Sequence, residues 1–343
     1  SNSHGLPHWN LNPARLPVPP LSPAGRESRI IQNSTPPETA PNRRKFAAPM
    51  IVFLLFLAFL FGFLALAALF VPALQPWVFD PIGLRPESSL YRFAMLCAVI
   101  ALPFFLRYLR LNSWQYAGYT LPRQAAWKAV AKGLLIGIAI MLVLNAVQWA
   151  LNIHHFAPRA DRWNAGYFFR TLFSGLLSGL AVALIEETFF RGLMHSGMRR
   201  RLSFWPTALL TASLYAILHF MKPAPPGAAE FDIANAFRMI GAGIGRVGDF
   251  SPIADSFSTL VVAGVFLSMV RERTGNILWV IGIHAGWVMI IKLTRYATEP
   301  TVVAGQTSAW IGGYDDITGW LATLWLGLIA ATFWYFSRPP PDN

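Results

Sequence analysis

The sequence predicts an all-α fold, a polytopic membrane helix bundle with about eight transmembrane helices. The first observation behind this class is composition, since hydrophobic residues make up 55% of the 343 residues and charged residues only 13%. With 26 Phe, 13 Trp and 16 acidic residues, the chain has too little polar surface to coat a water-soluble domain. The second observation is that the apolar residues gather in long uncharged runs, as segments that cross a bilayer do.

The amino-terminal residues 1–45 differ from the rest of the chain. They contain nine prolines and many Ser, Asn and Arg residues, and they show no apolar periodicity. We therefore expect a disordered, Pro-rich cytoplasmic tail over residues 1–45 and a transmembrane helical bundle over residues 46–338. Cys97 is the only cysteine, which excludes an intrachain disulfide and a thiolate metal cluster.

Eight uncharged stretches approach the roughly 20 residues needed to cross about 30 Å of hydrocarbon. They lie near residues 48–71, 90–109, 130–151, 168–193, 204–221, 256–271, 276–293 and 317–336. The second, fourth and sixth have the shortest uncharged cores, so seven spans also fit the sequence. Gly175 and Gly179 form a small-xxx-small pair on the fourth span, which predicts a close contact with another helix.

Basic residues are distributed unevenly between the two sides of these spans. With the amino end inside, 17 Lys and Arg residues fall on inside segments and 10 on outside segments, and Arg191 lies within a span. This bias places both chain ends in the cytoplasm. Because the basic residues recur between apolar runs, the net charge of +12 reflects topology and attraction to anionic lipids, and nucleic acid is not an expected partner.

Two connecting segments have a distinctive composition. Ser113–Lys132 mixes Trp, Tyr and basic residues, which predicts a helix lying on the cytoplasmic interface. Lys222–Asp255 is polar and rich in Pro and Gly, which predicts a flexible loop and a candidate lid. Its stretch Gly243–Gly248 matches G-x-G-x-x-G, but no βαβ unit surrounds it, so nucleotide binding is not expected.

Three ionisable residues lie in the second half of the fourth span, where a bilayer disfavours charge. Glu187 and Arg191 are four residues apart with the acid first, so we expect them to pair on one helix face. Glu186 is rotated by about 100° and has no local partner, which is the situation of a general base. A buried ion pair with a carboxyl near the headgroups is the structural alternative.

Two histidines on other spans complete the set. His219 lies near the end of one span and His284 in the middle of another. Neutral helix packing does not need a glutamate and two histidines on three separate spans, which favours a chemical role. The more polar contexts of other candidates predict interfacial positions for His154, His155, His195 and Lys292. No H-E-x-x-H, G-x-S-x-G or S-x-x-K motif is present.

These residues resemble the motifs of the CPBP intramembrane proteases, the group that includes the CAAX prenyl endopeptidases and bacteriocin-processing or immunity proteins. The E-E-x-x-x-R motif is Glu186 to Arg191, continued by Gly192, and the second motif runs from Tyr215, where the family usually has Phe, to His219. The third is His284, although Val288 stands where the family has Asn or a similar polar residue. The resemblance covers about residues 168–293.

The resemblance implies an α-helical endopeptidase that hydrolyses peptide bonds within or beside the membrane, with a peptide or membrane-protein substrate. Glu186 would take a proton from water, His219 would orient that water, and His284 would donate to the oxyanion. Glu187 and Arg191 would fix the helix and the local charge, and the cavity would open toward the cytoplasmic half. Glu186, His219 and His284 would also suffice as ligands for Zn²⁺, so metal-dependent and metal-free hydrolysis both remain open.

Two other functions use the same residues. One is a catalytically inactive membrane scaffold or bacteriocin-immunity protein, which the valine at Val288 favours. The other is a proton-coupled transporter, against which the lack of a visible inverted repeat counts. The resemblance also implies a multi-pass integral membrane protein of the bacterial cytoplasmic (inner) membrane.

The charge count makes a prediction about topology. A cysteine introduced in the amino tail should be labelled from the cytoplasm, whereas one introduced near residue 240 should be labelled from outside. Membrane-impermeant maleimide applied to intact and opened vesicles, in a chain with Cys97→Ser, separates the two sides. Labelling of both positions from the same side would contradict the predicted topology.

Overall fold

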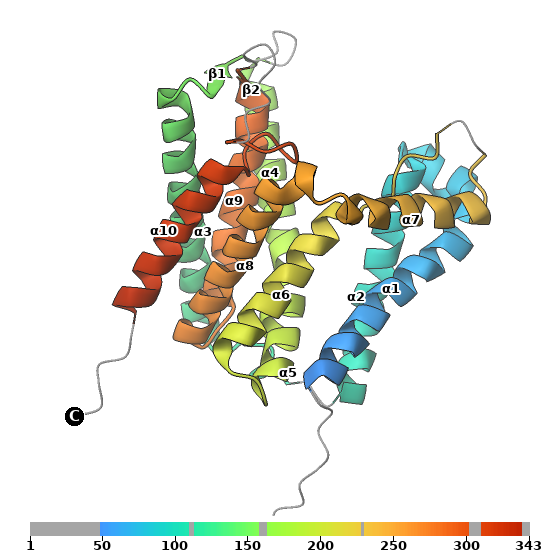
Figure 1. Ribbon diagram of the computed structural model, residues 1–343, viewed down its shortest axis with the longest axis horizontal. Coiled ribbons are helices and arrows are strands. Elements are labelled where there is room, and N and C mark those ends of the chain that lie inside the picture. The colour runs from blue at the N-terminus through green and yellow to red at the C-terminus, as the bar shows by residue number, and fades with distance from the viewer. Residues whose placement is uncertain (1–48, 110–112, 158–162, 228–229, 302–309, 338–343) are drawn as a thin grey trace, which may run out of the picture. The chain divides into compact units, whose positions relative to one another are not determined.

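The computed structural model describes residues 49–109, 113–157, 163–227, 230–301 and 310–337 (Figure 1). The tail predicted over residues 1–45 lies outside the described residues. The helices are α1 (Pro49–Leu74), α2 (Pro86–Leu109), α3 (Arg123–Ala150), α4 (Ala165–Glu187), α5 (His195–Arg199), α6 (Phe204–Phe220), α7 (Ile233–Gly248), α8 (Ala254–Thr274), α9 (Leu278–Ala297) and α10 (Trp320–Phe336). Short helical segments are η1 (Gln75–Phe79), η2 (Asp80–Ile82), η3 (Thr188–Met194) and η4 (Ser251–Ile253). Strands β1 (His154–Phe156) and β2 (Thr298–Pro300) form one antiparallel pair.

The all-α membrane bundle predicted from the sequence is confirmed. Within the described residues, six helical segments are long and apolar enough to cross a membrane, and α6 and α10 are shorter apolar helices of 17 residues. Seventeen residues rise about 26 Å, slightly less than the hydrocarbon thickness. Large apolar side chains point outward, including Phe104 at 74% exposure, Leu135 at 65% and Leu177 at 67%. Such surfaces are stable against lipid and unfavourable in water.

The flexible loop expected over Lys222–Asp255 is wrong for much of its length, because residues 233–248 form helix α7. The Asp232 side chain caps this helix by accepting a hydrogen bond from the backbone N–H of Asn235 at 2.6 Å. The buried residues Ala236, Met239 and Ile240 follow helical spacing and pack against α1. The apolar face of an amphipathic helix was therefore present in the segment, although its glycines and prolines suggested a loop.

The interfacial helix expected over Ser113–Lys132 is also corrected. Residues 114–118 form a turn, and the helix begins only at Arg123, so the basic half of this segment is the start of α3. Pro122 disfavours helical geometry in the residue before it, and Gly118 has a φ of +87°. The amino acid composition was suitable for an interface, but these two residues prevent one continuous helix.

Helix α9 packs closely between α3 and α4 through glycines (Figure 1). On α3, Gly133 and Gly137 lie so close to α9 that a Cβ at either position would overlap a backbone carbonyl of that helix. On α4, Gly175 faces Met289, and a Cβ at Gly179 would lie 2.8 Å from the carbonyl oxygen of Ala285. The predicted close contact of Gly175 and Gly179 with a neighbouring helix is confirmed, and the position of α9 is fixed by backbone contacts on two sides.

Helices α1 and α2 form the side of the bundle opposite α4, and they pack through aromatic side chains. The Phe105 ring of α2 stacks on Phe59 of α1 at 4.4 Å, and the Phe56 ring of α1 meets Phe189 of η3 edge to face at 4.9 Å. These contacts set the α1 and α2 pair beside the segment that follows the glutamates.

The glycine contacts predict that a larger residue at one of these glycine positions lowers the stability of the protein. Gly137→Ala should lower the free energy of unfolding by about 1–3 kcal/mol, because the added methyl overlaps the backbone of α9, which cannot rotate away. Gly62→Ala is the matched control, since nothing lies within 4 Å of its added methyl. Denaturation by sodium dodecyl sulfate in mixed micelles measures both variants. Equal midpoints for the two variants would contradict the close packing.

Candidate active site

The glutamates lie where the geometry of the fourth span changes. Helix α4 ends at Glu187, and the chain continues without a break into the π-helical segment η3, which holds Arg191. π-helical turns are rare and are frequently found at functional sites, because the wider turn changes the direction of neighbouring side chains. No residue in this stretch predicted the change, since the sequence reads as an ordinary apolar helix.

Glu187 is fully buried and binds two partners. Its Oε1 accepts a hydrogen bond from Arg191 Nη1 at 3.2 Å, as the four-residue spacing predicted. The same oxygen lies 2.8 Å from Nδ1 of His284, which comes from α9. The second contact joins residues 97 positions apart, so no local spacing predicted it. One carboxylate thus connects α4, η3 and α9.

Arg191 has an enclosed site for its guanidinium group. The side chain is fully buried, and its Cζ lies 4.6 Å from the centre of the Tyr215 ring. On α8, Gly264 leaves the necessary room, because a Cβ there would lie 2.9 Å from Arg191 Nη2. The cation is therefore held by one carboxylate and by the negative face of an aromatic ring.

Glu186 points in a different direction from Glu187, as expected for adjacent helical residues. Its side chain is 20% exposed, and Oε2 lies 3.9 Å from Nε2 of His284. This oxygen has no hydrogen-bond partner among the described residues. Of the two carboxyl groups, Glu187 is therefore enclosed in an ion pair and Glu186 is available to a bound molecule.

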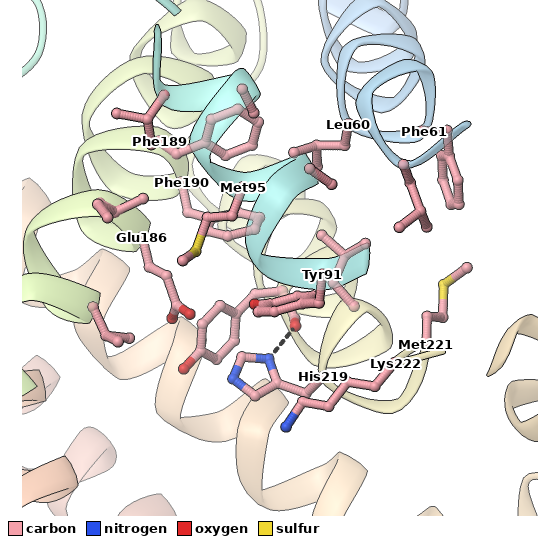
Figure 2. Close-up of a pocket in the computed structure, with 18 of the residues that line it drawn as sticks. Leu60, Phe61, Tyr91, Met95, Glu186, Phe189, Phe190, His219, Met221 and Lys222 are labelled. Atoms are coloured by element: carbon pink, nitrogen blue, oxygen red, sulfur yellow. Dashed lines mark hydrogen bonds between the residues drawn. The ribbon is translucent and has the colours of Figure 1, made fainter. Parts of the chain in front are cut away.

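Glu186 and His219 line one cavity of about 390 Å³ between the α1 and α2 pair and the α4 and α6 pair. Figure 2 shows the carboxyl group of Glu186 and the ring of His219 projecting into this cavity, with Tyr91 beside them. Most of the remaining lining is apolar and includes Leu60, Met95 and Phe189. The cavity thus offers a few polar groups within a largely apolar space, as ligand-binding and catalytic sites do.

The position of His219 is fixed by its own helix. Its Nδ1 lies 2.8 Å from the carbonyl oxygen of Tyr215, one turn earlier (Figure 2). A carbonyl oxygen can only accept, so Nδ1 carries the proton, and in the neutral ring Nε2 is an acceptor. The ring of Tyr215 also lies 4.4 Å from that of His219, centre to centre. His219 thus presents a lone pair to the cavity that Glu186 also lines.

Three polar residues of this cavity were not predicted from the sequence. Tyr91 and Tyr314 line it from α2 and from the segment before α10, and Lys222 lines it just after α6. Lys222 Nζ donates a hydrogen bond to the Tyr314 hydroxyl at 3.0 Å. The charge count assigns Lys222 to the outside, whereas we expected the cavity to open toward the cytoplasmic half. These two expectations disagree in the structure, and vesicle labelling decides between them.

The possible zinc ligands do not form a preformed site. Within the described ranges, no three His, Cys, Asp or Glu side chains are arranged as ligands of one metal ion. Nδ1 of His284 is bound by Glu187, and Nδ1 of His219 by a carbonyl oxygen. These bonds leave Nε2 of each ring, and zinc-bound histidines commonly hold their other nitrogen in this way. The described residues show no preformed three-ligand site, and Glu186, His219 and His284 are also suited to hydrolysis without a metal ion.

Val288 and Trp287 follow His284 but do not line the cavity. Val288 packs at the contact between α9 and α4, where a Cβ at Gly179 would lie 3.3 Å from Val288 Cβ. The Trp287 ring packs beside Phe266 of α8 at 6.1 Å, and its Nε1 has no hydrogen-bond partner among the described residues. The valine therefore fits the glycine-mediated contact between the helices.

Two of the histidines expected at the interface are buried. His195 is 2% exposed and lies 3.5 Å from the Glu272 carboxylate, and His154 is 5% exposed and bonds the carbonyl oxygen of Asp316 at 2.7 Å. Lys292 is exposed, as expected, and donates a hydrogen bond to Ser178 at 2.6 Å. The partners of these histidines lie far away in the sequence, so local polarity did not indicate that the side chains are buried, and their interfacial depth stays a prediction.

The buried ion pair predicts a large effect on stability. Arg191→Met should lower the free energy of unfolding by about 3–5 kcal/mol, because it leaves the Glu187 carboxylate buried without its cation. The double variant Glu187→Gln with Arg191→Met should lose less free energy of unfolding than the two single variants lose in total, and the difference should be about 1 kcal/mol or more. The pair of Arg85, whose side chain is 81% exposed, and Glu87 is the control, for which a coupling below about 1 kcal/mol is expected. Equal couplings would contradict the role of burial.

Comparison with known proteins bears on this geometry. Residues 168–290 match the family model described as type II CAAX prenyl endopeptidase Rce1-like, and this range includes Glu186, His219 and His284. No curated protein and no solved structure matches the chain. The matched range agrees with the resemblance predicted from the motifs. Residues 168–290 of this membrane protein are therefore similar to the Rce1-like type II CAAX prenyl endopeptidases, which supports the resemblance to the CPBP intramembrane proteases.

Proposed function

We propose that this protein is an intramembrane CAAX-type endopeptidase that hydrolyses a peptide bond with water activated by Glu186. The observation that supports this most strongly is the separation of the two neighbouring carboxyl groups. Glu187 is enclosed with Arg191, while Glu186 faces an apolar cavity together with His219. A carboxylate that faces a cavity without a cation of its own is suited to accept a proton.

The attacking water would lie between Glu186 and His219. The carboxylate takes one proton of the water, and Nε2 of His219 accepts a hydrogen bond from the other O–H group. Such a pair fixes the water with its lone pair toward the carbonyl carbon of the substrate, and orientation of this kind supplies a large part of the rate. The hydrogen bond from Nδ1 to the Tyr215 carbonyl keeps the ring of His219 in this tautomer.

His284 would stabilise the oxyanion. Its Nδ1 donates to Glu187, and Nε2 faces the Glu186 side, 3.9 Å from that carboxylate. With both glutamates ionised and Arg191 charged, the group carries one net negative charge, which a protonated His284 reduces to zero. In that form Nε2 donates a hydrogen bond to the negative oxygen of the tetrahedral intermediate.

The bonds change in two steps. In the first, water oxygen adds to the carbonyl carbon, and its proton moves to Glu186. In the second, Glu186 gives this proton to the amide nitrogen, the C–N bond breaks, and the carboxyl and amine products leave. Glu186 returns to its ionised form, so one water is consumed and no other reactant is needed.

The walls of the cavity favour an apolar substrate segment. Leu60, Met95 and Phe189 surround the space next to Glu186, and most of the lining is hydrophobic. We therefore propose that the substrate is a peptide or membrane protein whose residues near the cleaved bond are apolar, and that it approaches from the bilayer.

Glu186→Gln and His284→Ala should each abolish cleavage, because they remove the base and the oxyanion donor. Glu299→Gln is the matched control, since Glu299 is an exposed carboxylate outside the cavity, and it should cleave at the native rate. Purified full-length protein in lipid nanodiscs with a library of quenched fluorescent peptides measures all three. Native cleavage by Glu186→Gln would contradict the proposed base.

Val288 distinguishes an enzyme from an inactive relative within the same assay. If the added amide reaches the oxyanion, Val288→Asn should raise turnover, since a single oxyanion donor is typically worth about 100 to 1000-fold. No turnover by the native chain together with turnover by Val288→Asn would mean that the natural protein is an inactive scaffold. If Val288→Asn has no effect and Trp287→Phe lowers the rate tenfold or more, the indole N–H is the donor and the protein is an enzyme.

A further inference from the structure

A second cavity, of about 450 Å³, is lined by residues of α5 and of the carboxyl end of α8. These two segments lie at the same end of the bundle (Figure 1). The polar lining of the cavity includes Tyr116, His195, Arg199, Arg200, Arg271 and Glu272. It is distinct from the candidate active site, because it lies at the start of α6 and His219 near that helix's end. The length of α6, about 26 Å for 17 residues, separates them.

The lining of this second cavity is strongly basic. It includes three arginines and, among the described residues, one carboxylate, that of Glu272. Arg199 already binds this carboxylate, with Nη2 at 2.6 Å and Nε at 3.3 Å, and also donates to the carbonyl oxygen of Leu202 at 2.8 Å. Arg199 and Arg271 alone outnumber this carboxylate, so the cavity carries a net positive charge that attracts an anion.

Two buried nitrogen atoms of this cavity have no partner. Nε of Arg271 and Nδ1 of His195 are inaccessible to solvent and make no hydrogen bond to any described residue. His195 as a whole is only 2% exposed. Nε–H of Arg271 is a donor, so an acceptor oxygen of an anionic ligand would supply its missing partner. Nδ1 of His195 is an acceptor, because Nε2 of the same ring donates to Glu272.

The basic groups are held in place before any ligand arrives. The Arg271 guanidinium lies against the backbone of Gly118, where a Cβ would be 2.7 Å from its Nε. Arg200 lies over the Tyr116 ring, with Cζ 4.2 Å from the ring centre, and its Nε donates to the Tyr116 hydroxyl. That hydroxyl donates to the Ser196 carbonyl oxygen at 3.0 Å. Burial raises the pKa of Tyr116 above its usual value, although Arg200 opposes the shift, which keeps the proton needed for this bond.

The chemistry of the site and its position near the membrane surface indicate the class of ligand. Planar guanidinium groups match the geometry of phosphate oxygens. The cavity lies at the ends of apolar helices, and Trp114 and Trp205, 76% and 45% exposed, belong to the segments beside it, as in the aromatic belt at a membrane surface. We infer that this basic cavity binds the phosphate of an anionic phospholipid headgroup.

Native mass spectrometry of the full chain in a neutral detergent tests this inference. Phosphatidylglycerol, phosphatidylcholine and inorganic phosphate are titrated separately. One phosphatidylglycerol should bind at least about fivefold more tightly to the native chain than to Arg271→Gln, which corresponds to about 1 kcal/mol for a basic residue near a lipid surface. Arg123→Gln, which removes an exposed arginine outside the cavity, should bind as the native chain does.

A variant that is expected to bind the lipid more tightly distinguishes loss of the site from loss of the fold. Glu272→Gln removes the only carboxylate of the described lining and should tighten phosphatidylglycerol binding, which a damaged fold would not do. Equal binding of phosphatidylglycerol by the native chain and Arg271→Gln, or equal binding of phosphatidylcholine and phosphatidylglycerol, would overturn the inference. Saturation by inorganic phosphate at the same concentration as the lipid would overturn the assignment to a lipid.

Discussion

The geometry of the candidate site depends on one buried carboxylate, that of Glu187. Charge at this depth is tolerated only when it is paired, and Glu187 binds both a guanidinium group of its own span and an imidazole from α9. The two bonds fix the rotation of α4 about its axis and the height of His284 along α9. Since Glu186 is the preceding residue, the same bonds also determine the direction in which Glu186 points. The glycine contacts allow these bonds to form, because only close backbones bring the two helices within reach of a short side chain.

Two adjacent glutamates in different surroundings can have different roles in one site. The bonds to Arg191 and His284 hold the Glu187 side chain in one position, which suits a positioning group. A mostly apolar cavity with one imidazole nearby leaves Glu186 free to gain and lose a proton, which suits a base. Exchanging the two environments would require rotating α4 by about 100°, and the contacts of Gly175 and Gly179 with α9 prevent that rotation.

Local features of the structure followed from the sequence, while features that join distant segments did not. Each of the eight expected spans contains a helix, and the pairing of Glu187 with Arg191 followed from a four-residue spacing. The contact between Glu187 and His284 depends on how α4 and α9 pack, which no spacing encodes. Helix α7 was missed because its glycines outweighed its apolar face, and the burial of His195 was missed because Glu272 lies 77 residues away. The π-helical segment has no known residue signature in this stretch, so it emerged only from the three-dimensional structure.

The manner in which α9 is packed has a mechanical consequence. Contacts made by backbone atoms leave no side chains to change rotamer, so α3, α4 and α9 resist deformation as a single stiff block. The opposite wall of the cavity, α1 and α2, meets its neighbours through phenylalanine rings such as Phe56 and Phe105, which can tilt and slide at small cost. The α1 and α2 side of the cavity is therefore easier to deform than the α4 side. We expect a bulky ligand to displace α1 and α2 and to leave the spacing between Glu186 and His284 unchanged.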